Sequence, residues 1–189
     1  MKKLLLIIGA PGSGKTTNAE LIAKNNERIT HYSTGDMLRA EVAKKSARGK
    51  DIESYISQGN IVPIKIVIKT ILDAIAQAPT DVVIIDGYPR SLEQMYELDN
   101  FLSNDFSVKL ISVLEIDVSL ETARERVLGR ARGADDSDEV FNKRMHVYMQ
   151  PLIDIRAFYN AKRVLKAFSG ESSVENIVTE IETFLEQKI

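Results

Sequence analysis

The sequence contains no cysteine among its 189 residues. Disulfide bonds, zinc sites built from thiolates and cysteine nucleophiles are therefore all excluded, and a reducing, cytoplasmic compartment is the simplest expectation. A chain of this length buries enough surface to fold around one core without cross-links. We therefore expect residues 1–189 to form a single domain, with no structural zinc.

Blocks of one charge and long apolar runs are also missing. The net charge is only -2, with acidic and basic residues interspersed, so no basic surface for nucleic acid is predicted. The apolar run Leu4–Ile8 follows two lysines but is shorter than the apolar region of a signal peptide. No run approaches the roughly 18 residues that a membrane span requires. We expect no nucleic-acid or membrane partner and, because no long exposed apolar stripe is evident, a monomer.

Short apolar runs, each followed by a helical pattern, determine the predicted fold class. Leu4–Ile8, Val82–Ile85 and Leu110–Leu114 are typical of buried parallel strands joined by crossover helices. Two weaker runs, Arg28–Tyr32 and Val164–Phe168, add a fourth and a fifth strand. The sequence thus predicts an α/β fold with a doubly wound, parallel, five-stranded sheet and helices on both faces.

Helical periodicity marks the segments between these runs. We predict helices at residues 15–24, 35–45, 64–77, 91–102, 120–128, 138–158 and 174–188. Pro151 lies inside the segment 138–158, and because proline removes a helix donor and clashes with the preceding turn, we expect two helices there. No strand-like run occurs between about residues 39 and 77, which predicts a helical insertion that stands off the sheet.

Residues 9–16 read G-A-P-G-S-G-K-T and match the phosphate-loop pattern G-x-x-x-x-G-K-[ST] between a predicted strand and a predicted helix. The glycines allow backbone N–H groups to converge on an anion at the helix N-terminus. Lys15 can then meet the outer phosphates, and a hydroxyl of Thr16 or Thr17 can complete a Mg²⁺ shell. A glycine-rich turn without a ligand is the structural alternative. The loop indicates phosphate binding only, so GTPases, ATPases and small-molecule kinases all stay possible.

Two further segments can form a second phosphate site. Ser33–Arg39 begins with helix-capping residues and places Arg39 where its guanidinium can bind a phosphate, although a solvated arginine explains the pattern equally well. The sequence Asp86-Gly87-Tyr88-Pro89-Arg90 directly follows a predicted strand. Asp86 should therefore lie beside the phosphate loop, where it can hold metal-bound water, while a strand closed by a turn is the simpler interpretation.

Together and in this order, the three segments resemble those of adenylate kinases, and the resemblance covers nearly all 189 residues. It implies reversible, Mg²⁺-dependent phosphoryl transfer, ATP + AMP = 2 ADP, which maintains the balance of adenine nucleotides. The small-molecule partners would be ATP, AMP and ADP. The resemblance also implies a helical AMP-binding insertion at about residues 33–62 and a short lid at about residues 130–136 that lacks a zinc cluster.

The same resemblance implies roles for individual residues. Those implied to bind ATP are Gly12, Ser13, Gly14, Lys15, Thr16, Thr17, Arg126, Arg130 and Ser172. Those implied to bind AMP are Thr34, Arg39, Asn60, Ile61, Val62, Gly87, Tyr88, Pro89, Arg90, Gln94, Arg132 and Arg144. The implied catalytic set is Lys15, Asp86, Arg90, Arg132 and Arg144. Mg²⁺ would have no direct protein ligand and would be held by phosphates and water near Thr16, Thr17, Asp36 and Asp86.

The chain departs from the family pattern at two positions. Thr16 stands where most adenylate kinases carry glycine, whereas Thr17 matches the family's threonine. Gly133 is one extra residue in the lid relative to short relatives, which affects the alignment of Arg132. Without the resemblance, the arginines from 126 to 144 would be interpreted as a solvated charged surface.

Other functions are compatible with parts of the pattern. A UMP/CMP kinase uses a similar framework, and Thr34 with Gln94 favours adenine because a carboxamide can pair with a purine edge. A second alternative is a nucleotide-dependent switch, which would need no second phosphate site. A third is a catalytically inactive nucleotide-binding module, which would need no catalytic lysine. His31 and His146 are the only histidines, and since neither belongs to a recognisable pattern we predict that both are structural.

Overall fold

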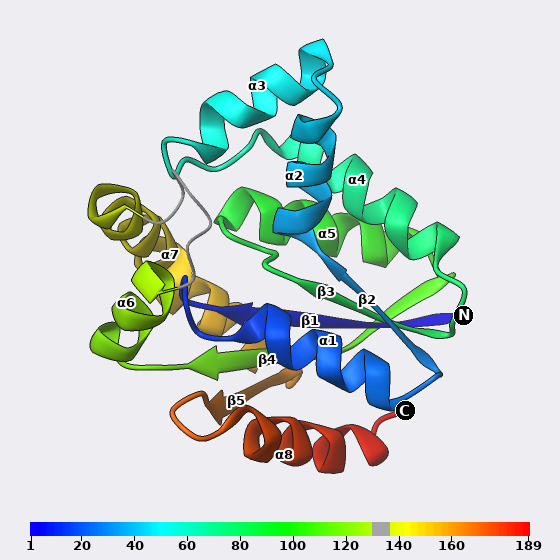
Figure 1. The fold of residues 1–189 in the computed structure, drawn as a ribbon. Coiled ribbons are helices and arrows are strands. Elements are labelled where there is room, and N and C mark those ends of the chain that lie inside the picture. Colours follow the sequence, from blue (N-terminus) through cyan, green and yellow to red (C-terminus); the bar gives the residue numbers. More distant parts are fainter. Residues whose placement is uncertain (130–136) are drawn as a thin grey trace.

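The computed structural model describes residues 1–129 and 137–189. In these residues five parallel strands form one sheet in the order β2-β3-β1-β4-β5 (Figure 1). The strands are β1 (Lys2–Gly9), β2 (Ile29–Ser33), β3 (Val82–Asp86), β4 (Val108–Asp117) and β5 (Leu165–Ser169). The predicted α/β class, the parallel sheet and all five strand positions are confirmed.

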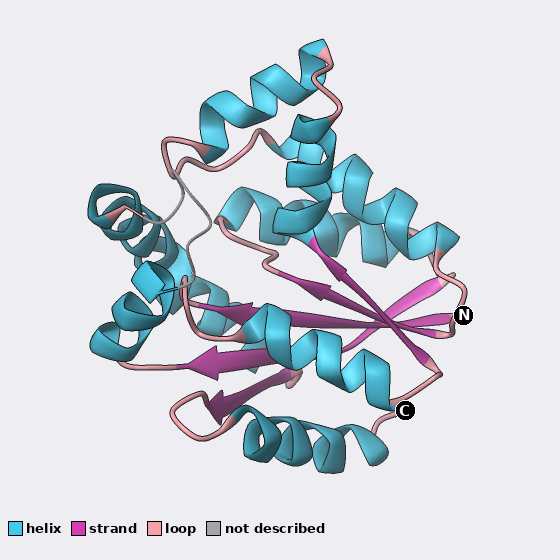
Figure 2. Cartoon of the chain, in the orientation of Figure 1, coloured by secondary structure: helices cyan, strands magenta, loops and turns pink. Residues whose placement is uncertain are grey.

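Helices cover both faces of the sheet (Figure 2). They are α1 (Lys15–Asn25), α2 (Thr34–Ala43), α3 (Ala47–Ile56), α4 (Ile64–Gln77), α5 (Leu92–Asn104), α6 (Leu120–Gly129), α7 (Asp138–Ala161) and α8 (Val174–Glu186). None of the helices within the described ranges is long and apolar enough to cross a membrane.

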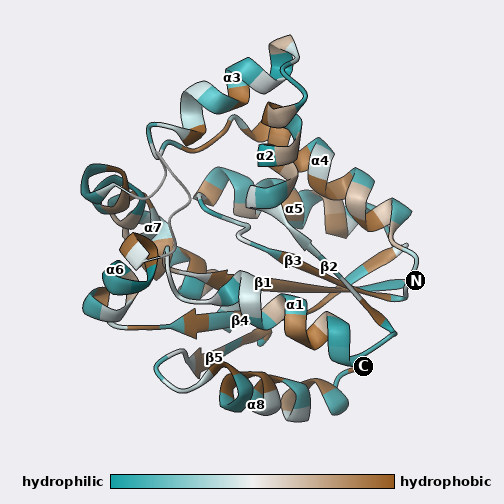
Figure 3. Ribbon diagram, viewed as in Figure 1, coloured by the Kyte–Doolittle hydropathy of each residue, from teal (hydrophilic) through white to brown (hydrophobic). Residues whose placement is uncertain are grey.

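Alternation along the central strands divides the core into two layers, because successive strand residues point to opposite faces. Leu5, Ile7 and Ile84 face α1 and α8, where they pack with side chains such as Ile22 and Ile181. Leu4, Leu6, Val83 and Ile85 face the other way, towards α4, α5 and α7. Figure 3 shows the apolar central strands enclosed between the helices. Burial on both faces explains why these strands are continuous apolar runs in the sequence.

The helical insertion consists of α2 and α3, which lie beyond the end of the sheet in Figure 1. The helix predicted at residues 35–45 is α2, which ends at Ala43, whereas α3 was not predicted as a separate helix. Between them Lys45 adopts a left-handed backbone conformation with φ 54°. Ser46 then caps α3 by accepting a hydrogen bond from the Gly49 N–H at 3.0 Å. Gly49 lies against α2, where an added Cβ would be 2.6 Å from the Glu41 carbonyl oxygen. The two helices therefore pack tightly as a hairpin.

The expectation of two helices around Pro151 was wrong, because α7 continues through Pro151 as one helix. A proline inside a helix costs about 3 kcal/mol. Phe141 lies before Pro151, and Leu152 and Ile155 lie after it, and all three side chains are buried. Burying each of them contributes about 1.5–3 kcal/mol, so packing outweighs the lost hydrogen bond.

Replacing Pro151 with Ala should therefore stabilise the protein. Alanine restores the N–H that proline lacks and relieves the clash with the preceding turn, so we expect the free energy of unfolding to rise by about 1–3 kcal/mol. Urea denaturation followed by circular dichroism would measure the change. An unchanged or lower stability would show that the packing of α7 depends on a bend at Pro151.

Candidate active site

The phosphate loop joins β1 to α1 and lies against α6. Gly12 and Gly14 have φ angles of 82° and 84°, in the region that favours glycine. A Cβ at Gly12 would lie only 2.2 Å from the Ala123 carbonyl oxygen on α6. The first turn of α1 contains no acidic residue, so its positive end is left for an anion. The backbone of this segment thus has the conformation that a phosphate-binding loop requires.

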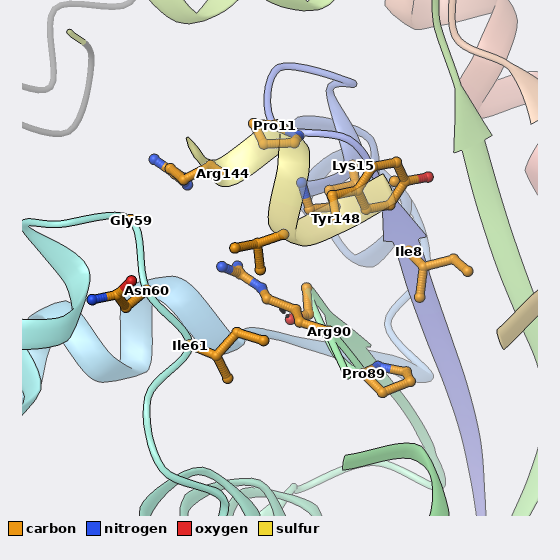
Figure 4. Close-up of a pocket in the computed structure, with 13 residues that line it drawn as sticks. Ile8, Pro11, Lys15, Gly59, Asn60, Ile61, Pro89, Arg90, Arg144 and Tyr148 are labelled. Carbon is orange, nitrogen blue, oxygen red and sulfur yellow. Dashed lines mark hydrogen bonds between the residues drawn. The ribbon is translucent and has the colours of Figure 1, made fainter. Parts of the chain in front are cut away.

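A cleft begins at this loop. Its first cavity is lined by Pro11 and Lys15 together with Arg90, Arg144 and Tyr148. Lys15 comes from α1, Arg90 from the loop between β3 and α5, and Arg144 from α7, and Figure 4 shows the three side chains around one cavity. The Lys15 ammonium donates a hydrogen bond to the Ala10 carbonyl oxygen at 3.1 Å. Three cations from separate parts of the sequence make this cavity suitable for several phosphate groups.

A second cavity adjoins the first. The two share lining residues from the α3–α4 loop, from the end of β3 and from α7, namely Gly59, Asn60, Ile61, Gly87, Arg90 and Arg144. The second cavity is further lined by Thr34, Arg39, Val62 and Gln94. The two cavities are therefore neighbours, and Arg90 and Arg144 line both of them.

Thr34 makes the second cavity a candidate binding site. Its hydroxyl is buried and has no hydrogen-bond partner within the described residues, which is costly unless a ligand supplies the bond. Thr34 opens α2, whose N-cap Ser33 accepts a hydrogen bond from the Asp36 N–H at 3.3 Å. One turn later Arg39 pairs with Asp36 at 2.5 Å. The start of α2 thus brings a hydroxyl and a guanidinium to the same cavity.

The turn after β3 shapes the floor of the cleft. Gly87 has a φ of 74°, and the Arg90 Nε donates to its carbonyl oxygen at 2.9 Å. The Gln94 side-chain oxygen accepts from the Arg90 backbone N–H at 2.7 Å, which leaves the amide nitrogen of Gln94 as the donor. Tyr88 is fully buried beneath the turn and donates to the Gln94 carbonyl oxygen at 2.7 Å. Tyr88 therefore supports Arg90 and Gln94 from below, and its side chain does not line either cavity.

Asp86 lies at the end of β3 and is 2% exposed. One of its oxygens accepts a hydrogen bond from the Thr16 hydroxyl at 3.1 Å, and the other lies 2.5 Å from His31 Nε2. His31 was predicted to be structural, yet it contacts a predicted catalytic residue. The parallel register places His31 opposite Ile84, two positions before Asp86, so both side chains are on the face of the sheet that α1 covers. The contact arises because β2 lies next to β3 in the sheet, an arrangement that the sequence alone does not show.

Tyr148 is another cleft residue that sequence reasoning missed. Its hydroxyl donates to Glu115 at 3.3 Å, and Arg156 Nε donates to both oxygens of the buried Glu115 at 2.9 Å. Burial and the neighbouring Glu115 raise the pKa of the Tyr148 phenol, so the hydroxyl stays protonated and can act as a donor. Tyr148 follows Arg144 by one helical turn, and that spacing is the only signal the sequence offered.

The remaining predicted site residues are more scattered. Arg126 on α6 reaches the phosphate loop, with its guanidinium 3.9 Å from the position a Cβ would take at Gly14. Thr17 is exposed, and Ser13 is buried. Ser172 lies before α8, exposed, where its hydroxyl accepts a hydrogen bond from Asn176. Arg130, Arg132 and the lid at residues 130–136 lie outside the described residues.

The phosphate loop, Asp86 and the residues that line the cleft all lie in the part of the sequence that one protein-family model matches. The family model described as "Adenylate kinase" matches residues 7–164. The chain belongs to the adenylate kinase family. The resemblance that the sequence motifs carried is therefore confirmed.

Adenylate kinases of several bacteria are similar to this chain over their whole length. The adenylate kinase of Helicobacter hepaticus is 60% identical over 190 residues, covering 100% of both chains. That of Nautilia profundicola is 59% identical over 189 residues, covering 100% of this chain and 98% of the relative. That of Campylobacter fetus subsp. fetus is 57% identical, with 100% and 99% covered. Membership of the adenylate kinase family makes the chain a phosphotransferase that acts on adenine nucleotides.

Proposed function

We propose that this chain catalyses reversible, Mg²⁺-dependent phosphoryl transfer, ATP + AMP = 2 ADP, within the cleft described above. The observation that carries the proposal is that the two cavities adjoin and that Arg90 and Arg144 line both of them. Transfer between two nucleotides requires two phosphate sites that meet, whereas a hydrolytic switch requires one. The family assignment supports the same reaction.

Each nucleotide has its own end of the cleft. The phosphates of ATP would lie at the start of α1, within reach of the loop N–H groups and Lys15. The phosphate of AMP would lie near Arg39, with its base towards Thr34 and Gln94. An oxygen of the AMP phosphate attacks the γ-phosphorus of ATP in line, and the bond from that phosphorus to the β-phosphate oxygen breaks.

The side chains act through charge and position. Lys15, Arg90 and Arg144 neutralise charge that is spread over the transferring group, and the arginines assigned by resemblance, Arg130 and Arg132, would add to them. No side-chain nucleophile is needed, and no general base either, because a phosphate monoester is largely deprotonated near pH 7. Enclosure by the insertion at about residues 33–62 would exclude the water that could hydrolyse ATP.

The residues beside the phosphate loop fit a Mg²⁺ ion. Asp86 and Thr16 supply oxygen donors, the type that Mg²⁺ prefers, next to the phosphate site. Within the described residues no cluster of three or more His, Cys, Asp or Glu side chains could hold a metal alone, so most ligands would be phosphate and water oxygens. When bound, Mg²⁺ would neutralise charge on the outer phosphates of ATP.

Thr34 provides a test of the AMP site. We expect Thr34→Val to raise the KM for AMP about tenfold, because valine keeps the shape of threonine but cannot form the hydrogen bond with the base. The KM for ATP should stay the same. Initial-rate kinetics with each nucleotide varied in turn would measure both values. Thr183→Val, on the exposed surface of α8, is the matched control. Equal effects on both nucleotides would contradict the placement of AMP in the second cavity.

The wider setting of the protein is proposed from its composition. We place it in the cytoplasm because it lacks cysteine, and we propose a monomer without nucleic-acid or membrane partners, since its charges are interspersed. Sedimentation at micromolar concentration would test the oligomeric state.

The reaction itself is tested by the choice of acceptor. Purified protein is given Mg-ATP with AMP, CMP, UMP, GMP or no acceptor, and ADP is measured. We expect strong stimulation by AMP alone, with two ADP formed for each ATP consumed. A preference for CMP or UMP would change the base assignment and keep the mechanism. Slow hydrolysis that no acceptor alters would replace the proposal with a nucleotide-dependent switch.

A further inference from the structure

A buried carboxylate on β4 ties α7 to the sheet. The side chain of Glu115 is 2% exposed, and Arg156 donates to it from Nε, 2.9 Å from both oxygens, and from a terminal nitrogen, 2.7 Å from one of them. The Tyr148 hydroxyl donates to the same carboxylate at 3.3 Å. We call these three residues the Glu115 network. One buried carboxylate thus holds two side chains of the same helix in defined directions.

The Glu115 network lies beside the cleft. The parallel register places Glu115 opposite Ile8 of β1, and Ile8 lines the first cavity. Tyr148 lines the same cavity, as does Arg144, and Figure 4 shows both side chains on one helix. Residues four apart lie on one face of a helix, one turn from each other. Anchoring Tyr148 therefore determines where Arg144 stands in the cleft.

The network contacts α7 on both sides of Pro151. Tyr148 precedes the proline and Arg156 follows it. Because proline cannot donate a helical hydrogen bond, the two halves of α7 are joined by one bond fewer at this point. Glu115 bridges the weakened turn, since it accepts hydrogen bonds from one residue of each half.

Stability alone does not require charges at this place. Replacing a buried ion pair with apolar residues of similar size is often neutral or stabilising. Apolar side chains of α7, such as Phe141 and Leu152, already bury the helix against its neighbours. A guanidinium on a carboxylate adds directional contacts, which apolar packing does not supply.

We infer that Glu115, Tyr148 and Arg156 are positioning residues for Arg144 and hold its guanidinium at the transferring phosphate. The inference rests on the proposed function, in which Arg144 neutralises charge on that group. The loop N–H groups and Lys15, which would hold the phosphates of ATP, come from other elements. Loss of the network should therefore lower kcat and leave the binding of ATP unchanged.

The first test removes both charges at once. The pair variant, Glu115→Leu with Arg156→Met, leaves no buried charge without a partner and should keep the fold. We expect its kcat for AMP-dependent ADP formation to fall about tenfold, because small displacements at a reacting centre are costly. The KM for ATP should stay within about twofold of the wild-type value. A wild-type kcat in the pair variant would overturn the inference.

Two conservative variants leave the buried charge of Glu115 paired. Tyr148→Phe keeps the aromatic ring and the ion pair but loses the hydroxyl, and we expect its kcat to fall severalfold with little change in thermal stability. Arg156→Lys keeps the charge but loses the planar fork, so its kcat should lie between those of the wild type and the pair variant. Wild-type kcat in both variants would contradict the positioning role.

A double-mutant cycle tests whether the network acts through Arg144. Arg144→Ala alone should lower kcat about a hundredfold. If the network only positions Arg144, adding the pair variant to Arg144→Ala should cost less than about twofold more. A further loss as large as in the wild-type background would show that the network acts elsewhere, and would overturn the inference.

Lys162→Met is the matched control. Lys162 directly follows α7 and pairs with Asp99 of α5, and it is not among the described residues that line either cavity. Its replacement removes another ion pair that ties α7 to the core, yet kcat should stay at the wild-type value. A loss of kcat equal to that of the pair variant would show that any loosening of α7 slows the reaction, against the inference.

Failure of the inference and failure of the proposed function are distinguishable. If the reaction is wrong, wild-type protein shows no AMP-dependent formation of ADP. If only the positioning role is wrong, the wild type is active, and either the pair variant has the wild-type kcat or its effect adds in full to that of Arg144→Ala.

Discussion

Arg90→Ala should lower kcat for AMP-dependent ADP formation about a thousandfold. Arg90 lines both cavities, and the proposed reaction brings the two sets of phosphates together beside it. Its Nε donates to the Gly87 carbonyl oxygen at 2.9 Å, which directs the guanidinium into the cleft. Alanine removes a charge that stabilises the transferring group, and the surrounding water cannot replace it once the cleft is enclosed.

Arg48→Ala is the control for this prediction. Arg48 is on α3 and contacts the backbone of α4 at Ile66, outside both cavities. We expect its kcat to stay near the wild-type value. Arg90→Lys keeps the charge but loses the planar fork, so an intermediate kcat is expected. If Arg90→Ala lost less than about tenfold, the placement of the transferring phosphate beside Arg90 would be contradicted.

Gly12→Ala should lower kcat/KM for ATP by at least about a hundredfold. The φ of 82° disfavours any residue with a side chain, and the added Cβ would lie 2.2 Å from the Ala123 carbonyl oxygen. Because α6 and the loop cannot both keep their positions, the loop N–H groups would move away from the phosphates. A displacement of about 1 Å at a reacting centre is enough to cost about a hundredfold in rate.

Gly129→Ala is the matched control, because a Cβ at Gly129 meets nothing within 4 Å in the part of the chain that the structure describes. It should bind ATP as the wild type does. Calorimetric titration with ATP and thermal unfolding of both variants would separate lost binding from lost stability. Wild-type ATP affinity in Gly12→Ala would show that the loop tolerates a different conformation and that its tight approach to α6 is not required.

Local patterns predicted the parts of the protein that depend on neighbouring residues. The phosphate loop was predictable because its glycines, Lys15 and the following helix are contiguous. The strands β1 and β3 were predictable because burial on both faces requires an unbroken apolar run. For the second cavity, only the lining residues were predictable. The family resemblance assigned Thr34, Asn60 and Gln94 to one site, and no rule of residue spacing did so.

Contacts between distant segments were beyond the sequence. The pairing of His31 with Asp86 depends on β2 lying next to β3, and no residue in either strand encodes that order by itself. The continuity of α7 through Pro151 depends on buried side chains on both sides of the proline, and local propensity alone favours a break. The turn between α2 and α3 was missed as well, because helical periodicity does not report the left-handed conformation of Lys45.

The fate of the γ-phosphate of ATP tests the central claim most directly. Protein is mixed with ATP labelled in the γ-phosphate, unlabelled AMP and Mg²⁺, and the products are separated before the reaction reverses. The proposed cleft predicts that the label appears in ADP and that no labelled inorganic phosphate accumulates. Label in inorganic phosphate, at a rate that AMP does not change, would contradict the account.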